Sequence, residues 1–235
     1  MKKEEKIILA IYLFAQLMIY ISFLTMDFFN LGNSTYLKYS SIIINLVLAT
    51  IFSIKLKKVN LFFLLGLVFT LLADTFLLVL DSYYSIGLVC FNIVQFFYFL
   101  GLKNAIKKSF IPQLIIRISL FTFSLIIGLS LSQTEIFLSI SYICSMILTI
   151  FTLIFDVDLD KEKMVLLWGL ILFLLCDINV GLFNLGYYFN LSYVITSILE
   201  SISTNLMWFF YLPSQVEITL YLVISTKKER LNKRS

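Results

Sequence analysis

Polar and charged residues interrupt the chain at intervals, and the stretches between them are almost entirely apolar. Each stretch holds about 20 residues, which is the length an α-helix needs to cross the hydrocarbon core of a bilayer. The pattern predicts an all-α integral membrane bundle, with one transmembrane domain over residues 1–235. The eight transmembrane helices are expected near residues 7–26, 38–54, 60–80, 84–102, 112–132, 136–155, 164–185 and 205–225.

The composition narrows the class of protein further. Charged residues make up 14% of the chain, whereas a soluble domain carries about a quarter. The chain contains no histidine, which excludes a histidine-ligated zinc site and a Ser-His-Asp triad. Its three cysteines, Cys90, Cys144 and Cys176, are isolated within apolar segments, so the sequence indicates neither a disulfide framework nor a thiolate metal site. We therefore expect no metal, no cofactor and no nucleic-acid partner.

The basic residues lie mostly on one side of the predicted bundle. Of the 18 Lys and Arg residues, all except Lys38 and Arg117 precede the first span, follow the second, fourth or sixth span, or lie in the tail over residues 226–235. Cytoplasmic loops carry such an excess of positive charge. We expect both termini, including this basic tail, on the cytoplasmic side of the cell membrane. Arg117 lies inside the fifth span, and its long side chain is expected to extend toward the water boundary.

The segment between the seventh and eighth spans has a different pattern. Apolar residues recur at helical spacing from Leu191 to Leu206, and Ser, Thr, Asn and Glu200 occupy the opposite face. This stripe predicts an amphipathic helix over residues 190–204 that lies on the outer membrane surface. The alternative is one long eighth helix that enters the membrane obliquely and bends at Pro213.

A short motif occurs in both the third and the seventh span. Residues 66–74 read GLVFTLLAD and residues 169–177 read GLILFLLCD. Both spans cross the membrane in the same direction, which predicts two parallel four-helix repeats, at about 7–102 and 112–225, around a pseudo-two-fold axis. A carboxylate in a transmembrane helix costs roughly 2.5 to 3.5 kcal/mol and usually marks a functional site. Asp74 and Asp177 are therefore the candidate catalytic residues.

Each span with an aspartate is followed by a returning span that contains a glutamine. Gln95 shares a helix face with Asn92 and Tyr98, because residues three apart are neighbours on a helix. In the last span, Tyr211 and Gln215 are neighbours at a spacing of four. We expect these side chains to line a polar cavity with the two carboxyl groups and to bind the substrate. The alternative for Asn92 is a hydrogen bond between helices, which is common for polar residues in spans.

The order of these motifs resembles the YhhN family of membrane proteins with eight spans, which includes lysoplasmalogenases. The resemblance covers most of the chain from about residue 60. Where the family tends to have a histidine in the fourth span, this chain has Gln95, and Cys176 replaces the family's serine before the second aspartate. The matching residues are Ala73, Asp74, Leu77, Leu78, Gly87, Phe91, Tyr98, Gly169, Phe173, Asp177, Tyr211 and Gln215.

The resemblance implies cleavage of the vinyl ether bond of a lysoplasmalogen, a membrane lipid, to a fatty aldehyde and a glycerophospho-base. Acid–base catalysis by Asp74 and Asp177 suits this reaction, because two close acids in a site of low dielectric constant share a proton. Two other classes stay open. Paired acids between repeats also suit a proton- or cation-coupled transporter, and Gln95 in place of histidine favours a non-catalytic protein that binds lipid. The oligomeric state is left open.

Overall fold

The computed structural model describes residues 3–56, 60–189 and 191–232. Within these ranges the chain forms eight long helices and a short π-helix, and no strand. All eight long segments have the length and hydropathy of a membrane span, which confirms the predicted fold class. The elements are α1 (Lys3–Phe28), α2 (Thr35–Leu56), α3 (Leu61–Asp74), η1 (Thr75–Val79), α4 (Tyr84–Gly101), α5 (Phe110–Ser130), α6 (Thr134–Phe155), α7 (Lys161–Phe189) and α8 (Tyr193–Asn232).

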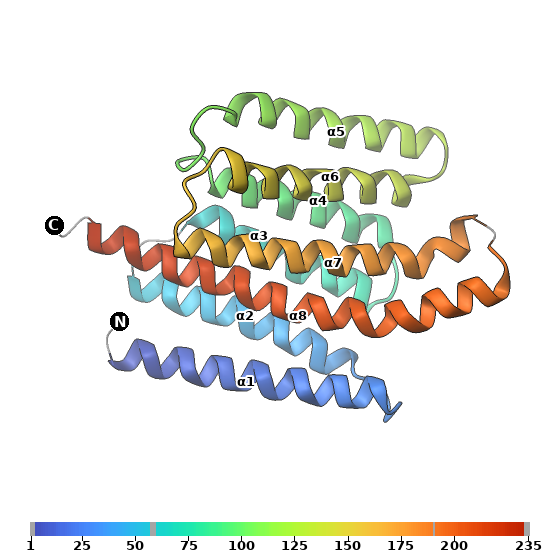
Figure 1. Cartoon of the computed structure of the whole chain (residues 1–235), viewed down its shortest axis with the longest axis horizontal. Coiled ribbons are helices and arrows are strands. Elements are labelled where there is room, and N and C mark those ends of the chain that lie inside the picture. Colours follow the sequence, from blue (N-terminus) through green and yellow to red (C-terminus); the bar gives the residue numbers. More distant parts are fainter. Residues whose placement is uncertain (1–2, 57–59, 190, 233–235) are drawn as a thin grey trace.

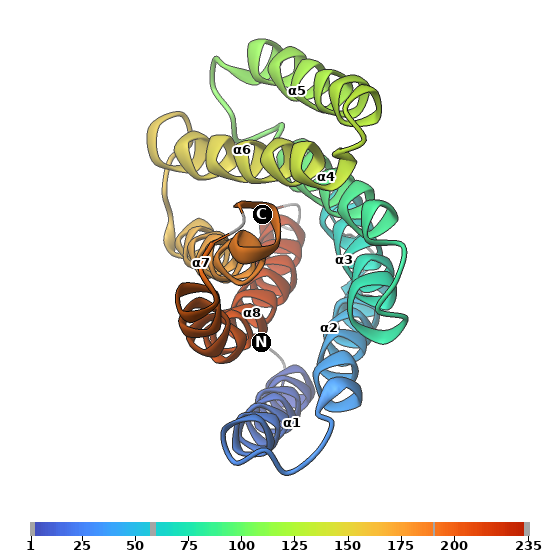
Figure 2. The same ribbon diagram turned by 90° about the vertical axis from the view of Figure 1, so that its right-hand side faces the viewer.

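In the described part of the chain, six helices form a closed ring around the centre of the bundle (Figures 1 and 2). Around this ring α2 packs against α3, α3 against α4, α4 against α6, α6 against α7, α7 against α8, and α8 against α2. Helix α1 lies outside the ring against α2, and α5 lies outside it against α6. The main group of buried apolar side chains draws on all six ring helices, so the ring encloses the core.

The two halves of the chain have matching neighbours. The contact of α1 with α2 corresponds to that of α5 with α6, the α3–α4 contact corresponds to α7–α8, and the α2–α8 contact corresponds to α6–α4. Two parallel four-helix repeats require this pairing. One relation differs, because α1 also packs against α8 whereas α5 has no comparable backbone contact with α4 among the described residues.

The glycine that opens each repeated motif lies where two helices cross closely. A Cβ atom at Gly66 would lie 2.4 Å from Cε1 of Tyr98 on α4. A Cβ atom at Gly169 would lie 3.0 Å from Cγ1 and 3.2 Å from the backbone nitrogen of Ile218 on α8. Glycine recurs at these two positions because each half packs its aspartate-bearing helix tightly against the helix that follows.

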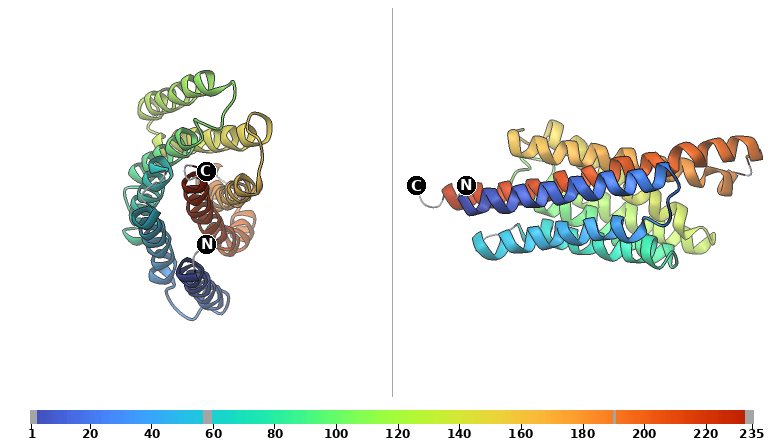
Figure 3. Two further views of the ribbon diagram at one scale, coloured as in Figure 1. Left: turned by 90° about the vertical axis from the view of Figure 1, so that its left-hand side faces the viewer. Right: turned by 90° about the horizontal axis from the view of Figure 1, so that it is seen from below.

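Helix α8 is continuous from Tyr193 to Asn232 and contains Pro213. The amphipathic segment predicted over residues 190–204 is thus not a separate helix. Residues 193–204 form the first turns of α8, as in the alternative of one long, bent helix, while residue 190 lies outside the described residues. Together with the end of α7, these turns project beyond the other helices (Figure 3). Continuity is favoured because the polar face at 190–204 never interrupts the helical spacing of the apolar residues.

The proline in α8 is accommodated by a hydrogen bond from α1. Pro213 has no N–H group, so it cannot bond to the carbonyl group of Phe209 one turn earlier. The Tyr20 hydroxyl on α1 donates to this carbonyl oxygen at 2.9 Å. Because a backbone carbonyl without a partner is costly inside a membrane, this bond helps to fix α1 on the outside of the ring.

Helix α1 begins and α8 ends at the same end of the bundle (Figure 1). The loops before α5 and after α6 also meet at this end, where the Asp156 carboxylate accepts hydrogen bonds from the side chain and the backbone N–H of Ser109. These bonds hold the pKa of Asp156 below its usual range. The assignment of this end to the cytoplasm stays a prediction from charge. Of the basic residues on which this assignment rests, five lie outside the described residues: Lys2, Lys57, Lys58, Lys233 and Arg234.

Candidate active site

Asp74 lies at the end of α3, where the helix changes to the π-helix η1. Its side chain is buried, and Oδ2 accepts a hydrogen bond of 2.7 Å from the Tyr211 hydroxyl on α8. A π-helical turn widens the helix locally and is frequent at functional sites. Beside it, the hydroxyl groups of Thr75 and Tyr39 lie 2.9 Å apart and connect this turn to α2. The sequence predicted the aspartate but gave no sign of the π-helical turn.

Asp177 is buried in α7, and its Oδ2 has no hydrogen-bond partner in the structure. The Tyr142 side chain on α6 interacts with this carboxyl group. Tyr142 was not among the predicted site residues. The repeat could have shown it, because Tyr142 stands at the same distance before Asp177 as Tyr39 stands before Asp74.

A continuous series of aromatic side chains leads from one aspartate to the other. Tyr211, which bonds to Asp74, lies against Phe173 with ring centroids 5.6 Å apart. Phe173 lies 5.7 Å from Phe91, and Phe91 lies 5.8 Å from Tyr142. Cys176, next to Asp177, lies within the electrostatic reach of both aspartates. The two carboxyl groups therefore belong to one region of the ring interior, although among the described residues they form no hydrogen bond with each other.

Both glutamines of the predicted site are completely buried. The amide nitrogen and oxygen of Gln95 have no hydrogen-bond partner in the structure, and neither does Oε1 of Gln215. The hydroxyl group of Tyr98 is also completely buried and has no hydrogen-bond partner. A buried polar group without a partner costs about 1–3 kcal/mol. The ring interior of the described residues thus contains several buried polar groups that make no hydrogen bond.

Asn92 has different surroundings from the other predicted site residues. Its Nδ2 donates to the carbonyl oxygen of Leu88 at 2.9 Å and to that of Leu138, on α6, at 3.0 Å. Both donors of the amide are therefore used within α4 and between α4 and α6. The side chain also lines a pocket that includes neither Asp74 nor Asp177. The structure places Asn92 beside the aspartate region, in a connection between helices.

The fold and the buried acidic groups define a multi-pass helical membrane protein with a polar site inside a ring of helices. The YhhN family model matches residues 34–220 of the chain, a range that contains both aspartates and the five other predicted site residues. The chain belongs to the YhhN family. Comparison with curated proteins and with solved structures gave no match.

Proposed function

We propose that the chain is a lysoplasmalogenase-like hydrolase of the cell membrane, which cleaves the vinyl ether bond of lysoplasmalogens. The observation that supports this most directly is the burial of two carboxyl groups, with unpaired amide and hydroxyl groups, inside one apolar ring. Ionisable groups buried in apolar surroundings inside a membrane cost free energy, and they usually serve a function. Membership of the YhhN family supports a hydrolase in general terms.

The hydrogen bonds suggest how the two aspartates divide the reaction. Oδ2 of Asp177 makes no hydrogen bond, so it can approach the β-carbon of the vinyl ether directly, as proton transfer requires. Asp74 is oriented by the Tyr211 hydroxyl and keeps Oδ1 for a water molecule. We assign Asp177 as the proton donor and Asp74 as the group that activates water. Gln95, Tyr98 and Gln215 then position the water and the oxygen atoms of the substrate.

The proposed steps conserve atoms and protons. Asp177 protonates the β-carbon, and the vinyl ether becomes an oxocarbenium ion that is stabilised by the nearby carboxylates. Water adds to the α-carbon while Asp74 accepts a water proton, which gives a hemiacetal. The hemiacetal splits into the aldehyde and the free hydroxyl of the glycerophospho-base when Asp74 protonates the leaving oxygen and Asp177 removes the hydroxyl proton. One water molecule is consumed, and both aspartates regain their starting states.

The direct test is aldehyde release by the purified protein in detergent micelles, with lysoplasmenyl-ethanolamine and lysoplasmenyl-choline as substrates. Micelles carry no ion gradient, so aldehyde release would support the hydrolase and argue against the transporter. A folded protein that releases no aldehyde from either lipid would contradict the proposal. Gradient-dependent uptake into proteoliposomes would then identify the transporter.

Replacing Tyr211 with phenylalanine removes the hydrogen bond to Asp74 and leaves the ring in place. We expect kcat for aldehyde release to fall about 2- to 10-fold, because a hydrogen bond of this kind contributes about 0.5–1.5 kcal/mol. Tyr142→Phe should have a smaller effect, because Tyr142 makes no hydrogen bond to Oδ2 of Asp177, the oxygen that we propose as the proton donor. Tyr193→Phe is the control, because Tyr193 is 86% exposed. An equal loss in all three variants would show that Tyr211 does not orient Asp74.

Replacing Gln95 with histidine tests whether this position takes part in proton transfer. We expect kcat to rise, by up to about 100-fold, because an imidazole at this buried site can accept and donate protons near neutral pH. Gln95→Leu, which removes both amide atoms, should lower kcat. Gln215→His is the matched control at the other completely buried glutamine. An unchanged kcat in both Gln95 variants would place this residue outside the reaction.

A further inference from the structure

Arg117 is buried inside α5, one of the membrane-spanning helices. Its Nη1 donates to the carbonyl oxygen and, at 2.5 Å, to the hydroxyl of Ser145 on α6. Its guanidinium carbon lies 4.2 Å from the ring centroid of Phe99 on α4. The expectation that this side chain extends to the water boundary is wrong, because Arg117 is 3% exposed and its guanidinium group contacts Ser145 on α6 and Phe99 on α4.

The positive charge of Arg117 has no negative partner in the described residues. Its hydrogen-bond acceptors are the neutral groups of Ser145 and, at 3.4 Å, Oε1 of Gln113. The Nε atom is buried and has no acceptor. A buried cation without an anion is strongly unfavourable, and in membrane spans such residues usually pair or mark a binding site. This side chain is therefore suited to an anionic ligand.

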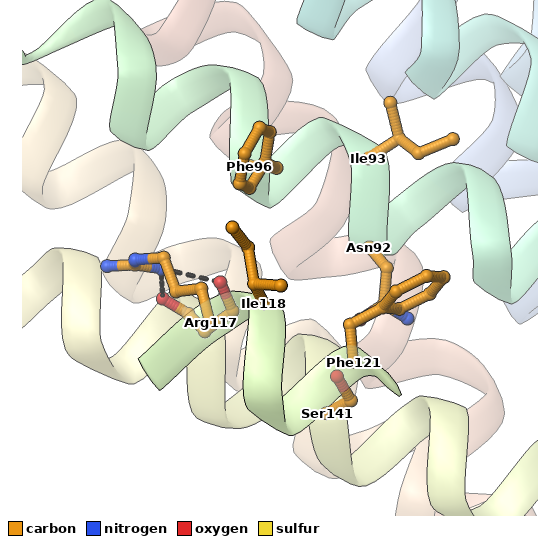
Figure 4. A pocket seen from close by; sticks show the side chains of 8 residues that line it. Asn92, Ile93, Phe96, Arg117, Ile118, Phe121 and Ser141 are labelled. Atoms are coloured by element: carbon orange, nitrogen blue, oxygen red, sulfur yellow. Dashed lines mark hydrogen bonds between the residues drawn. The ribbon is translucent and has the colours of Figure 1, made fainter. Parts of the chain in front are cut away.

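A pocket of about 230 Å³ lies beside Arg117, in the space between α4, α5 and α6 (Figure 4). Its polar lining consists of Arg117, Asn92, Ser141 and Ser145, and the remainder is aliphatic and aromatic. The volume is below the ~300 Å³ of the smallest typical ligand pockets. It suits a head group and the start of a hydrocarbon chain, with the rest of the chain in the bilayer. The apolar lining residues are Ile93, Phe96, Ile118 and Phe121.

In the first half of the chain, the helices that correspond to α5, α6 and α4 are α1, α2 and α8, and neutral side chains connect α1 to α2. There α1 packs against both α2 and α8, and its Gln16 and Tyr12 side chains bond to Asn45 on α2, each at 2.7 Å. In the second half α5 packs against α6, and its contacts with α4 in the described residues are made by side chains such as Arg117 and Phe110 on Phe99 rather than by close backbones. The pocket and the unpaired cation occur together at the point where the halves differ.

The pocket is separated from the two aspartates by the contact of α4 with α6. Phe91 and Tyr142 stack on each other and belong to the aspartate region. Asn92 and Ser141, adjacent to them in sequence, line the pocket. Neighbouring residues on a helix point in different directions, so the two helices present one face to the aspartates and another to Arg117. The pocket is therefore separate from the region of the two aspartates.

We propose that this pocket binds the oxyanion head of a membrane amphiphile, with the carboxylate or phosphate at Arg117 and the chain along Phe96 and Phe121. Arginine is suited to both groups, because its guanidinium presents several N–H donors in one plane. The position also fits, since Arg117 lies about two turns inside α5, near the end of the bundle predicted to be cytoplasmic. Basic pockets between spans on that side of a membrane bind anionic head groups.

Binding is measured by native mass spectrometry of the whole protein in a neutral detergent. The probes are oleate, which has a carboxylate, oleoyl-lysophosphatidylglycerol, which has a phosphate, and monoolein, which has the chain without a charge. We expect one of the anionic probes to bind at one site and monoolein to bind at least 10-fold more weakly. Arg117→Gln should weaken the anionic probe at least 10-fold, and Arg117→Lys should weaken it less.

The matched pair Phe121→Ala and Phe123→Ala tests the chain position. Phe121 lines the pocket, while Phe123, on the same helix, is 62% exposed. Only Phe121→Ala should weaken binding. If Arg117 were merely a structural link to Ser145, Arg117→Gln would lower the melting temperature and leave the affinity of the folded fraction unchanged. That result, or equal binding of monoolein, would overturn the proposal. Asp74→Asn and Asp177→Asn should leave this binding unchanged, so the test is independent of the hydrolase.

Discussion

Asp177→Asn is expected to lower kcat for aldehyde release by about 10²- to 10⁴-fold, the contribution of a positioned general acid. Asparagine has nearly the same shape as aspartic acid but cannot donate a proton from an acid group to the β-carbon. Asp74→Asn should cause a loss of similar size, because the amide cannot accept a proton from water. The measurement is single-turnover aldehyde release in micelles, which separates chemistry from substrate binding.

The same two substitutions should not destabilise the fold. Both carboxyl groups are buried in an apolar ring, and transfer of an ionisable group from water to such a place is unfavourable. A neutral amide of the same size reduces this cost, so the melting temperatures should stay equal or rise, as is common when a functional site is removed. The control is Asp158→Asn in the loop after α6, where the Asp158 side chain is 83% exposed. Full activity in either buried variant would contradict the assigned roles.

The sequence was sufficient to predict the eight spans of this protein, because hydropathy and length alone determine where a chain can cross a membrane. It did not predict that the last span continues back to Tyr193 as one helix. It was also sufficient to find the duplicated motif, whose glycines recur for a physical reason. A Cβ atom would overlap with Tyr98 at Gly66 and would lie in tight contact with Ile218 at Gly169. Local periodicity and short motifs therefore predicted both the architecture and the two most buried acidic groups.

Features that depend on contacts between distant segments were not predictable in this way. Tyr142 reaches Asp177 from another helix, and the π-helical turn after Asp74 leaves no mark in the hydropathy pattern. The sequence predicted that the Arg117 side chain extends to the water boundary from near a helix end. Its burial depends on Ser145 and Phe99, which lie on two other helices. Side-chain partners across a bundle are determined by packing, and a single sequence records packing only indirectly.

Asn92 and Gln95 illustrate the same limit on one helix. They are three residues apart and share a side of α4 in a helical projection. In the bundle, Asn92 bonds to the backbone of α6, whereas Gln95 is completely buried and makes no hydrogen bond. A separation of about 60° around the helix axis is enough to direct two neighbouring side chains to different surroundings. Periodicity predicts which residues share a face of a helix. The contacts of that face depend on the neighbouring helix, which periodicity does not identify.

The second large effect is expected on stability, from Gly66→Ala. The new Cβ atom would lie 2.4 Å from Cε1 of Tyr98. Tyr98 cannot retreat easily, because it is completely buried and stacks on Phe63 with ring centroids 5.2 Å apart. Overpacking of this kind typically costs 1–3 kcal/mol, which corresponds to a fall in melting temperature of about 2–12 °C for a chain of this size. Thermal unfolding in detergent measures it.

Gly181→Ala is the matched control, because Gly181 also lies in a helix long and apolar enough to span a membrane. A Cβ atom at Gly181 would meet nothing within 4 Å, and alanine favours a helix over glycine by up to about 1 kcal/mol. This variant should be as stable as the parent or more stable. The opposite signs of the two results would separate steric overlap at the α3–α4 crossing from a general effect of removing glycine. Equal stability of Gly66→Ala and the parent would mean that α3 and α4 can move apart, and the packing of Tyr98 against α3 would then not depend on this glycine.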